Sequence, residues 1–284
     1  MTGHEEKFAG GVAVITGAGA GIGSGFARRA GELGMHVVVT DINAAAAEAV
    51  AQDIRDKGGK AEAMVVDVSK PAELDRLAGE VFAKHGSVRL LINNAGIETI
   101  GYTWEIPAER WEATLNINIH GIIHGVRAFV PKMLATGEEC WIANLASIGA
   151  FGMMPTQTAY MLTKHAVQSF SECLFLEMQL KQAPIHVSSV IPGMIKTSIF
   201  DAGAGQGEPA AAAGHRKAMH DMMAAYGMDL AEGSRVMMEQ IAANKFWVSS
   251  QPEMTEQSLA ARVRFFQEQA DPQVAEQARH LLEH

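Results

Sequence analysis

A tyrosine and a lysine four residues apart, Tyr160 and Lys164, could together move a proton. They belong to a stretch with helical patterning, where four residues make about one turn, so the two side chains share a face. A free tyrosine has a pKa of about 10, and oxidation of an alcohol near neutral pH requires its phenolate. A nearby ammonium group can lower that pKa, so the pair suits general acid/base chemistry at a carbonyl or alcohol oxygen.

Ser147 makes this interpretation more specific, because the tyrosine–lysine spacing alone is common on exposed helices. It follows the predicted strand Trp141–Leu145 and precedes Tyr160 in the chain. In a parallel sheet the carboxyl ends of the strands open onto one crevice. A hydroxyl group there could hold the substrate oxygen during hydride transfer.

A glycine-rich turn lies between the predicted strand Val12–Thr16 and the predicted helix Ile22–Leu33. The free N–H groups and the positive dipole end of a helix start favour a pyrophosphate, and glycines let the backbone approach it. The spacing is G-x-x-x-G-x-G and differs from G-x-G-x-x-G, because positions 22 and 24 are Ile and Ser. The turn therefore predicts a dinucleotide site formed by Gly17, Gly19, Gly21, Ile22 and Gly23.

Asp41 follows the second predicted strand, Val37–Thr40. A carboxylate at this position can accept hydrogen bonds from both ribose hydroxyls and would repel a 2′-phosphate. No Arg or Lys is adjacent, and Ala20 occupies a loop position where a basic residue could meet that phosphate. We therefore expect NAD rather than NADP. The alternative is that Asp41 only caps the following helix.

Apolar runs of strand length alternate along the chain with amphipathic runs of helix length. The predicted strands are Val12–Thr16, Val37–Thr40, Ala63–Val66, Val88–Ile92, Trp141–Leu145, His186–Ile191 and Phe246–Ser249. The predicted helices are Ile22–Leu33, Ala44–Lys57, Pro71–His85, Pro107–Ala135, Thr158–Lys181 and Ser258–Gln269. This alternation predicts an α/β fold, a Rossmann-like doubly wound parallel sheet of about seven strands with helices on both faces.

No break in composition divides the chain, so we expect one domain over residues 1–284, with a cofactor and catalytic core at about 10–200. Residues at about 198–228 are rich in Gly, Ala, Met and His and have weak periodicity. They predict a flap over the site, or else a surface excursion without function. Residues at about 250–284 predict a C-terminal helical extension.

With these motifs in place, the sequence resembles the short-chain dehydrogenase/reductase family. The family markers are Thr16-Gly17-x-x-x-Gly21-x-Gly23, Asp67, Asn93-Asn94-Ala95-Gly96, Asn118, Ser147, Tyr160-x-x-x-Lys164, and Pro192-Gly193 with Thr197. Ala146 departs from the pattern, since a second serine is frequent there. The segment after Phe246 also departs, because many tetrameric members end at a glycine-rich strand.

The resemblance implies a role for each marker. Tyr160 would be the general acid/base, and Lys164 would lower its pKa and bind the nicotinamide ribose. Ser147 would orient the substrate oxygen, and Asn118 would hold a water in a proton relay from Lys164, unless it serves only packing or capping. The implied cofactor-binding residues are Gly17, Gly19, Gly21, Ile22, Gly23, Asp41, Ile42, Asp67, Val68, Asn94, Ala95, Gly96, Tyr160, Lys164, Pro192, Gly193, Ile195 and Thr197.

The positions expected near the substrate are mostly apolar and pliable. They are Glu98, Ile148, Phe151, Met153, Met154, Gln157, Met194 and Phe200. Such a lining suits a bulky or aromatic secondary alcohol and its ketone. The long flap and extended C-terminus also resemble family members that act on aryl or steroid-like alcohols.

Charge and composition exclude several kinds of partner. The net charge of −9 disfavours nucleic acid and anionic membranes. No long uncharged apolar window and no apolar leader are present, which predicts a cytoplasmic protein outside the membrane. His120 and His124 lack the glutamate of a metalloprotease motif, so no metal is expected. The long helices at Pro107–Ala135 and Thr158–Lys181 could form the interface of a homodimer or homotetramer.

Three functions fit these observations. The first is an NAD-dependent alcohol dehydrogenase or ketone reductase. The second is a lyase or epimerase that uses NAD transiently, and the third is a non-catalytic NAD-sensing module on the same fold. The set of Ser147, Tyr160 and Lys164 favours an enzyme over a sensor, because a sensor needs no proton donor. Nothing indicates a permanently retained cofactor, which favours the first function.

Overall fold

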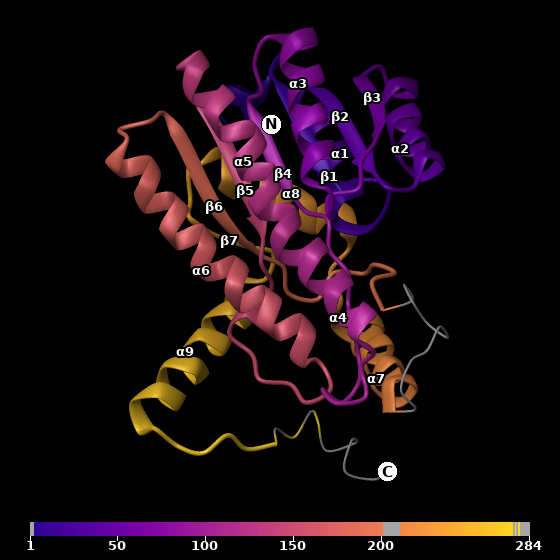
Figure 1. Cartoon of the computed structure of the whole chain (residues 1–284), viewed down its shortest axis with the longest axis vertical. Coiled ribbons are helices and arrows are strands. Elements are labelled where there is room, and N and C mark those ends of the chain that lie inside the picture. Colours follow the sequence, from indigo (N-terminus) through magenta and orange to yellow (C-terminus); the bar gives the residue numbers. More distant parts are fainter. Residues whose placement is uncertain (1–2, 201–210, 275, 277, 279–284) are drawn as a thin grey trace.

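A parallel sheet forms the centre of the protein, whose computed structural model describes residues 3–200, 211–274, 276 and 278 (Figure 1). Within these residues the sheet has seven strands in the order β3-β2-β1-β4-β5-β6-β7. Their bounds are β1 Val12–Thr16, β2 His36–Asp41, β3 Lys60–Val65, β4 Leu90–Asn93, β5 Cys140–Leu145, β6 Ile185–Ile191 and β7 Trp247–Ser249. Every neighbouring pair is parallel. The strand order reverses between β1 and β4, and doubly wound sheets open a ligand crevice at such a point.

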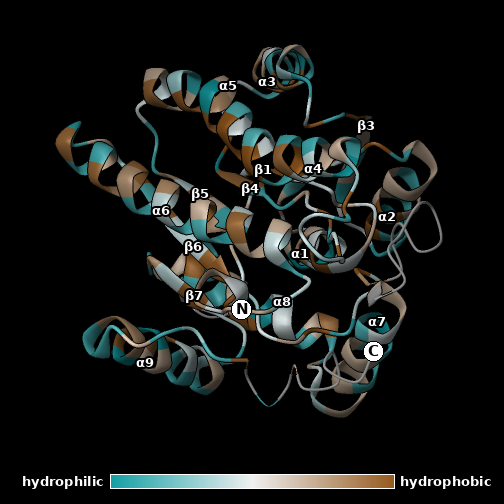
Figure 2. Ribbon diagram, turned by 60° about the horizontal axis from the view of Figure 1, so that its bottom comes forward, coloured by the Kyte–Doolittle hydropathy of each residue, from teal (hydrophilic) through white to brown (hydrophobic). Residues whose placement is uncertain are grey.

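Helices cover both faces of the sheet, and a separate cluster of buried apolar residues lies on each face. One face carries α1 Gly21–Glu32, α2 Ala44–Asp56 and α8 Leu230–Ala242. The other carries α3 Pro71–His85, α5 Gly121–Thr136 and α6 Thr158–Leu180. Figure 2 shows hydrophilic and hydrophobic residues alternating around these helices, as expected for helices with one side on a sheet. The central strands β1, β4 and β5 are buried along their whole length, which explains their unbroken apolar runs.

Local sequence signals explain where several helices begin and end. The side chain of Asn43 caps α2 by accepting a hydrogen bond from the backbone N–H of Ala46 at 3.1 Å. Helix α3 begins at Pro71 and is followed by Gly86, which has φ +79°. Helix α5 is likewise followed by Gly137, in the left-handed region with φ +66°.

The remaining elements are short or lie beside the sheet. They are η1 Glu5–Phe8, α4 Ala108–Leu115, η2 Asn116–His120, η3 Ile148–Ala150, α7 Ala211–Tyr226 and α9 Pro252–Glu268. Figure 1 shows α7 and α9 at the lower end of the molecule. None of the helices in the described part of the chain has the length and hydropathy needed to cross a bilayer.

The predicted α/β fold is confirmed, with differences in detail. The helix expected over Pro107–Ala135 is three segments, because a wider π-helical turn, η2, separates α4 from α5. Helix α9 begins at Pro252 rather than at Ser258, since proline is favoured in a first turn. In the predicted flap, residues 201–210 lie outside the described residues, and the part from Ala211 onward is the helix α7.

Candidate active site

A cavity of about 810 Å³ opens at the carboxyl ends of the strands. Its wall runs from the glycine turn after β1, past the end of β4, to η3 and α6. Helices α7 and α9 close the side away from the sheet. The volume is within the range of small-molecule sites in proteins.

The glycine turn fits the pyrophosphate of a dinucleotide. Gly17 has φ +62°, and a Cβ atom there would lie 2.7 Å from the Cα atom of Ala95. Helix α1 begins at Gly21, and Ala20 at its N-cap provides no side-chain hydrogen bond. No acidic residue lies in the first turn of α1, so its N–H groups and positive dipole end remain available to an anion.

Gly19 and Gly23 do not line the cavity, and they pack closely against residues on the other side of the turn. A Cβ atom at Gly19 would lie 2.9 Å from the carboxylate oxygen Oδ2 of Asp41. A Cβ atom at Gly23 would collide with the carbonyl oxygen of Gly17 and the side-chain amide of Asn94. Both glycines therefore permit close packing.

Asp41 lies at the end of β2, where it holds two backbone segments together. Its Oδ2 atom accepts a hydrogen bond from Gly19 N–H at 3.0 Å, and its Oδ1 atom accepts one from Asn43 N–H at 2.9 Å. Asn43 caps α2, so the alternative that Asp41 is merely the helix cap does not describe the structure. Asp41 and Ile42 line the cavity, and Lys164 is the only lysine or arginine among the described lining residues.

Hydrogen bonds join the residues that follow β1 and β4 at the floor of the cavity. The side-chain amide of Asn94 donates to the carbonyl oxygens of Thr16 at 2.8 Å and Gly17 at 3.0 Å. The hydroxyl of Thr16 in turn accepts from the backbone N–H groups of Asn94 and Ala95. The other predicted cofactor positions that line the cavity are Gly21, Ile22, Asp67, Val68, Gly96, Pro192, Gly193, Ile195 and Thr197.

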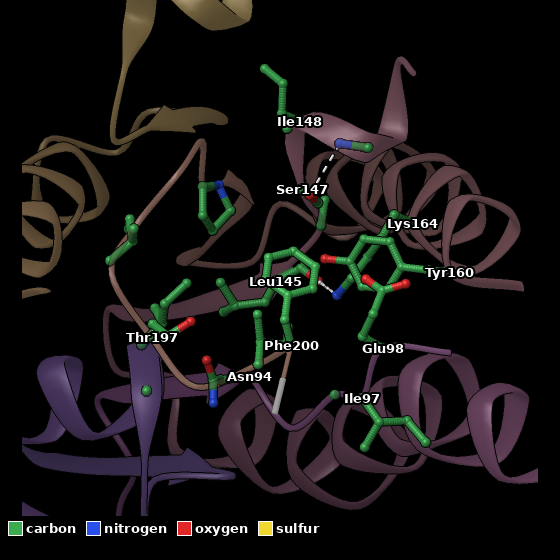
Figure 3. Close-up of a pocket in the computed structure, with 18 of the residues that line it drawn as sticks. Asn94, Ile97, Glu98, Leu145, Ser147, Ile148, Tyr160, Lys164, Thr197 and Phe200 are labelled. Carbon is green, nitrogen blue, oxygen red and sulfur yellow. Dashed lines mark hydrogen bonds between the residues drawn. The ribbon is translucent and has the colours of Figure 1, made fainter. Parts of the chain in front are cut away.

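Ser147, Tyr160 and Lys164 meet at one wall of this cavity (Figure 3). The ammonium nitrogen of Lys164 donates a 2.8 Å hydrogen bond to the carbonyl oxygen of Leu145 and lies 5.4 Å from the centre of the Tyr160 ring. The Ser147 oxygen accepts a hydrogen bond from Gly149 N–H at 3.0 Å. The Ser147 hydroxyl also hydrogen-bonds to Tyr160.

Burial dominates the pKa values of these groups. It raises the pKa of Tyr160, the charge of Glu98 raises it further, and the Ser147 hydroxyl acts in the opposite direction. Burial lowers the pKa of Lys164 to about 8, although Glu98 opposes this shift. The expected lowering of the tyrosine pKa is therefore not present in this structure, because burial and the charge of Glu98 outweigh the Ser147 hydrogen bond.

Asn118 is buried in the π-helical turn and does not line the cavity. Its Oδ1 atom accepts from Ile97 N–H at 2.8 Å, and its Nδ2 atom donates to the Ile97 carbonyl oxygen at 2.9 Å. Nδ2 also donates to the hydroxyl of Thr163 at 3.1 Å. The side chain thus holds the chain after β4 in place.

Most of the predicted substrate positions do lie on the cavity. Glu98, Ile148, Met153, Met154, Gln157, Met194 and Phe200 all line it. Phe151 does not, because its ring is buried against Ile122 and Val167 and faces Trp247.

Sequence reasoning predicted a flap over the site that includes α7, but it did not identify the lining residues of α7 or α9. These residues are His215, Ala218, Met219, Met222, Met223, Met254 and Ser258. The abundance of methionine after residue 211 did not identify these side chains, because it is equally typical of core packing. The residues between β7 and α9 position the loop after β6, because Gln251 Oε1 accepts from Met194 N–H at 2.7 Å and Ser250 Oγ from Gly193 N–H at 3.0 Å.

One histidine-containing cluster lies away from the cavity. His36, Glu62 and His85 bring their possible ligand atoms within 4.8 Å of one another. Both imidazoles hydrogen-bond to Glu62 Oε1, and Lys84 pairs with Oε2 at 2.6 Å. These contacts join β2, β3 and α3.

Together the sheet, the glycine turn and the tyrosine–lysine pair define a dinucleotide-binding α/β protein. Comparison with known families agrees, since the short chain dehydrogenase model matches residues 11–206. The chain belongs to the short-chain dehydrogenase/reductase family of oxidoreductases.

Individual relatives match only part of this chain, and at modest sequence identity. Probable oxidoreductase EphD of Mycobacterium bovis is 35% identical over 185 residues, 65% of this chain, but the match spans only 31% of that protein. Cyclohexanol dehydrogenase of Acinetobacter sp. is 34% identical over 69% of this chain and 77% of its own length.

Solved structures resemble nearly the whole chain. A short-chain dehydrogenase/reductase from Burkholderia phymatum in complex with NAD has a TM-score of 0.88 at 29% identity and covers 95% of this chain and 98% of its own. Two other solved neighbours hold NADP instead. Members of the family near this chain therefore bind one or the other nucleotide.

Proposed function

We propose that the protein is an NAD-dependent dehydrogenase that interconverts a bulky or aromatic secondary alcohol and its ketone. The observation that carries this proposal is the convergence of Ser147, Tyr160 and Lys164 on a cavity wall continuous with the glycine turn. A sensor would need the glycine turn but no proton-transferring phenol. When bound, NAD would accept the hydride, and its oxidised ring would add a positive charge near Tyr160.

In this proposal the chain's own residues manage the proton and the substrate oxygen. The Ser147 hydroxyl, oriented by Gly149 N–H and in hydrogen-bond contact with Tyr160, donates to the substrate oxygen when substrate is bound. Tyr160 Oη removes the hydroxyl proton during oxidation and returns it during reduction. Lys164, fixed on Leu145, stabilises the phenolate electrostatically.

Asp41 supports NAD over NADP. A 2′-phosphate needs a cation beside it, whereas Asp41 presents a carboxylate at the end of β2. No arginine or lysine other than Lys164 is found among the described residues lining the cavity. Lys164 lies instead at the opposite end, beside Tyr160.

The apolar wall supports a bulky substrate. Methionines from the loop after η3 and from α7 line the cavity, including Met153, Met154, Met219 and Met222. Their flexible side chains can adapt to an aryl or alicyclic body. Helix α7 would act as the cover of this part of the cavity.

The deciding experiment follows nicotinamide absorbance while the protein is offered NAD and a panel of secondary alcohols. Net formation of reduced nicotinamide with aryl-substituted alcohols is the expected result. Turnover of a substrate without any net change in absorbance would contradict the proposal and indicate a lyase or epimerase. Turnover of small aliphatic alcohols alone would contradict the proposed substrate class.

We also propose that the protein assembles through α5 and α6, as a dimer or as the dimer unit of a tetramer. Large apolar side chains are exposed along these helices at Ile123, Leu134, Leu162, Leu176 and Leu180. A row of exposed apolar residues on a helix pair is typical of an interface.

A further inference from the structure

Glu98 is a buried carboxyl group in the wall of the cavity, close to Tyr160 and Lys164. Only 4% of the residue is exposed, and it lines the cavity. Its Oε1 atom has no hydrogen-bond partner within the part of the chain that the structure describes. Burying such a group without a partner costs on the order of 1–3 kcal/mol. A bound molecule could offset that cost.

The backbone on both sides of Glu98 is held in place. Asn118 binds both backbone polar groups of Ile97. On the other side, the hydroxyl of Thr99 hydrogen-bonds to that of Thr114 at 2.7 Å, and both threonines are buried. Glu98 is therefore a preorganised part of the wall.

Figure 3 shows the Glu98 carboxyl group directed toward Tyr160 and Lys164. Its charge raises the pKa of Tyr160. That effect opposes formation of the phenolate, so Glu98 does not assist the proton transfer proposed for Tyr160. Because the Oε1 atom is buried without a partner at the cavity wall and the group opposes phenol ionisation, its position is best explained by recognition of a ligand.

We propose that Glu98 is a specificity-determining residue that hydrogen-bonds a second hydroxyl group of the substrate, on a carbon close to the one that is oxidised. This inference rests on the proposed function and narrows its substrate class from secondary alcohols to diols with a bulky apolar body. The second hydroxyl lies near the reacting carbon because Glu98 lies beside Tyr160 and Lys164.

The charges around Glu98 favour a hydroxyl over other polar groups. A substrate ammonium would be repelled by the nearby Lys164, and a substrate carboxylate would be brought against the Glu98 carboxyl. Burial raises the pKa of Glu98 to about 8, outweighing Lys164, Thr99, Gln157 and Arg216, which all lower it. Near neutral pH the group is thus largely a neutral acid that both donates and accepts a hydrogen bond, as a hydroxyl does.

The test compares matched alcohols that differ only in the second hydroxyl. The probes are a phenylpropanol oxidised at its benzylic carbon and the phenylpropanediols that carry a second hydroxyl on either remaining carbon. The wild-type protein should prefer a diol by about 10-fold to 100-fold in kcat/KM. In Glu98→Leu this ratio should fall to about one, and Glu98→Gln should retain most of it, because an amide still donates and accepts.

Glu105→Gln provides a control, since Glu105 is exposed and does not line the cavity. This variant should keep the wild-type ratio. An unchanged ratio in Glu98→Leu would overturn the inference, as would a wild-type protein that does not distinguish the alcohols. If no alcohol is oxidised, the proposed function fails, and calorimetric binding of the same probes still decides this inference: equal affinities for diol and monoalcohol would overturn it.

Discussion

The ammonium nitrogen of Lys164 donates a 2.8 Å hydrogen bond to the carbonyl oxygen of Leu145 at the end of β5. This bond joins α6 to the sheet where the strand ends and keeps the positive charge at the edge that faces the cavity. The sheet thereby determines where the lysine lies relative to the phenol one turn earlier on the helix.

Replacing Lys164 by alanine should impair both catalysis and nucleotide binding. The change removes the cation that stabilises the phenolate and leaves the Leu145 carbonyl without its partner. We expect kcat to fall by at least about 100-fold and the Kd for NAD to rise. Lys181→Ala, at an exposed position just after α6, is the control and should change neither value. Normal NAD affinity in Lys164→Ala would contradict a ribose contact.

Replacing Tyr160 by phenylalanine should separate chemistry from binding. The ring still fills its position, but the proton acceptor is lost, so kcat should fall at least about 100-fold while the Kd for NAD stays nearly unchanged. Steady-state kinetics and fluorescence titration measure the two quantities. Tyr226→Phe, on the exposed side of α7, is the matched control. A variant at position 160 that keeps more than about a hundredth of wild-type kcat would rule out the proton-transfer role.

Replacing Asp41 by alanine should weaken the preference for NAD. The wild-type protein should have a higher kcat/KM with NAD than with NADP. The ratio of these two values should fall about tenfold in the variant, because the carboxylate is removed. Asp56→Ala, exposed at the end of α2, tests whether loss of any nearby negative charge has this effect. A wild-type protein that uses NADP better would show the assignment to be wrong.

Glu98 should make the stability of the protein depend on pH. Its pKa is raised to about 8 in the folded chain, whereas an unfolded glutamate has a pKa of about 4.3. As the pH rises between these values, the unfolded chain releases a proton that the folded chain keeps, so the free energy of unfolding falls. The loss should be complete above the folded pKa.

Glu98→Gln cannot titrate at this position and should escape that loss. Its free energy of unfolding should match the wild-type value more closely at low pH and exceed it by roughly 2–4 kcal/mol near pH 8. Urea unfolding at a series of pH values measures the difference. A constant difference between the two proteins across this range would contradict the raised pKa.

Replacing Leu176 by glutamate should disrupt assembly. This leucine is 57% exposed on α6, and a charge there would be buried in an interface formed by α5 and α6. Light scattering after size exclusion should report a monomer for the variant and a dimer or tetramer for the wild type. Val263→Glu, on the exposed side of α9, should leave the mass unchanged. A monomeric wild type would exclude the proposed interface.

The fold was predictable because its signals are local. Buried parallel strands are short apolar runs, and the glycine turn, Asp41 and the tyrosine–lysine pair each lie within a few residues of a strand or along one helix turn. The π-helical turn at Asn116–His120 was not predictable, because its residues have no signal that separates them from an ordinary helix.

The missing parts of the site depend on contacts between distant segments. Met219 and Met254 reach the cavity only because α7 and α9 fold back over the strand ends. The pKa of Tyr160 depends on burial and on Glu98, which belongs to another part of the chain. Phe151 follows Ser147 closely but faces the opposite way, toward Trp247, and sequence proximity to a motif could not reveal that direction.

The origin of the cavity wall has a consequence for how such proteins diverge. The proton-handling groups come from β5 and α6, whereas α9 contributes Met254 and Ser258, and Gln251 just before α9 anchors the loop after β6. Substitutions in the C-terminal part of the sequence can therefore change which substrates fit the cavity without changing the proton-handling groups. The same anchoring means that cutting the polypeptide before Gln251 would disturb nucleotide placement as well as substrate choice.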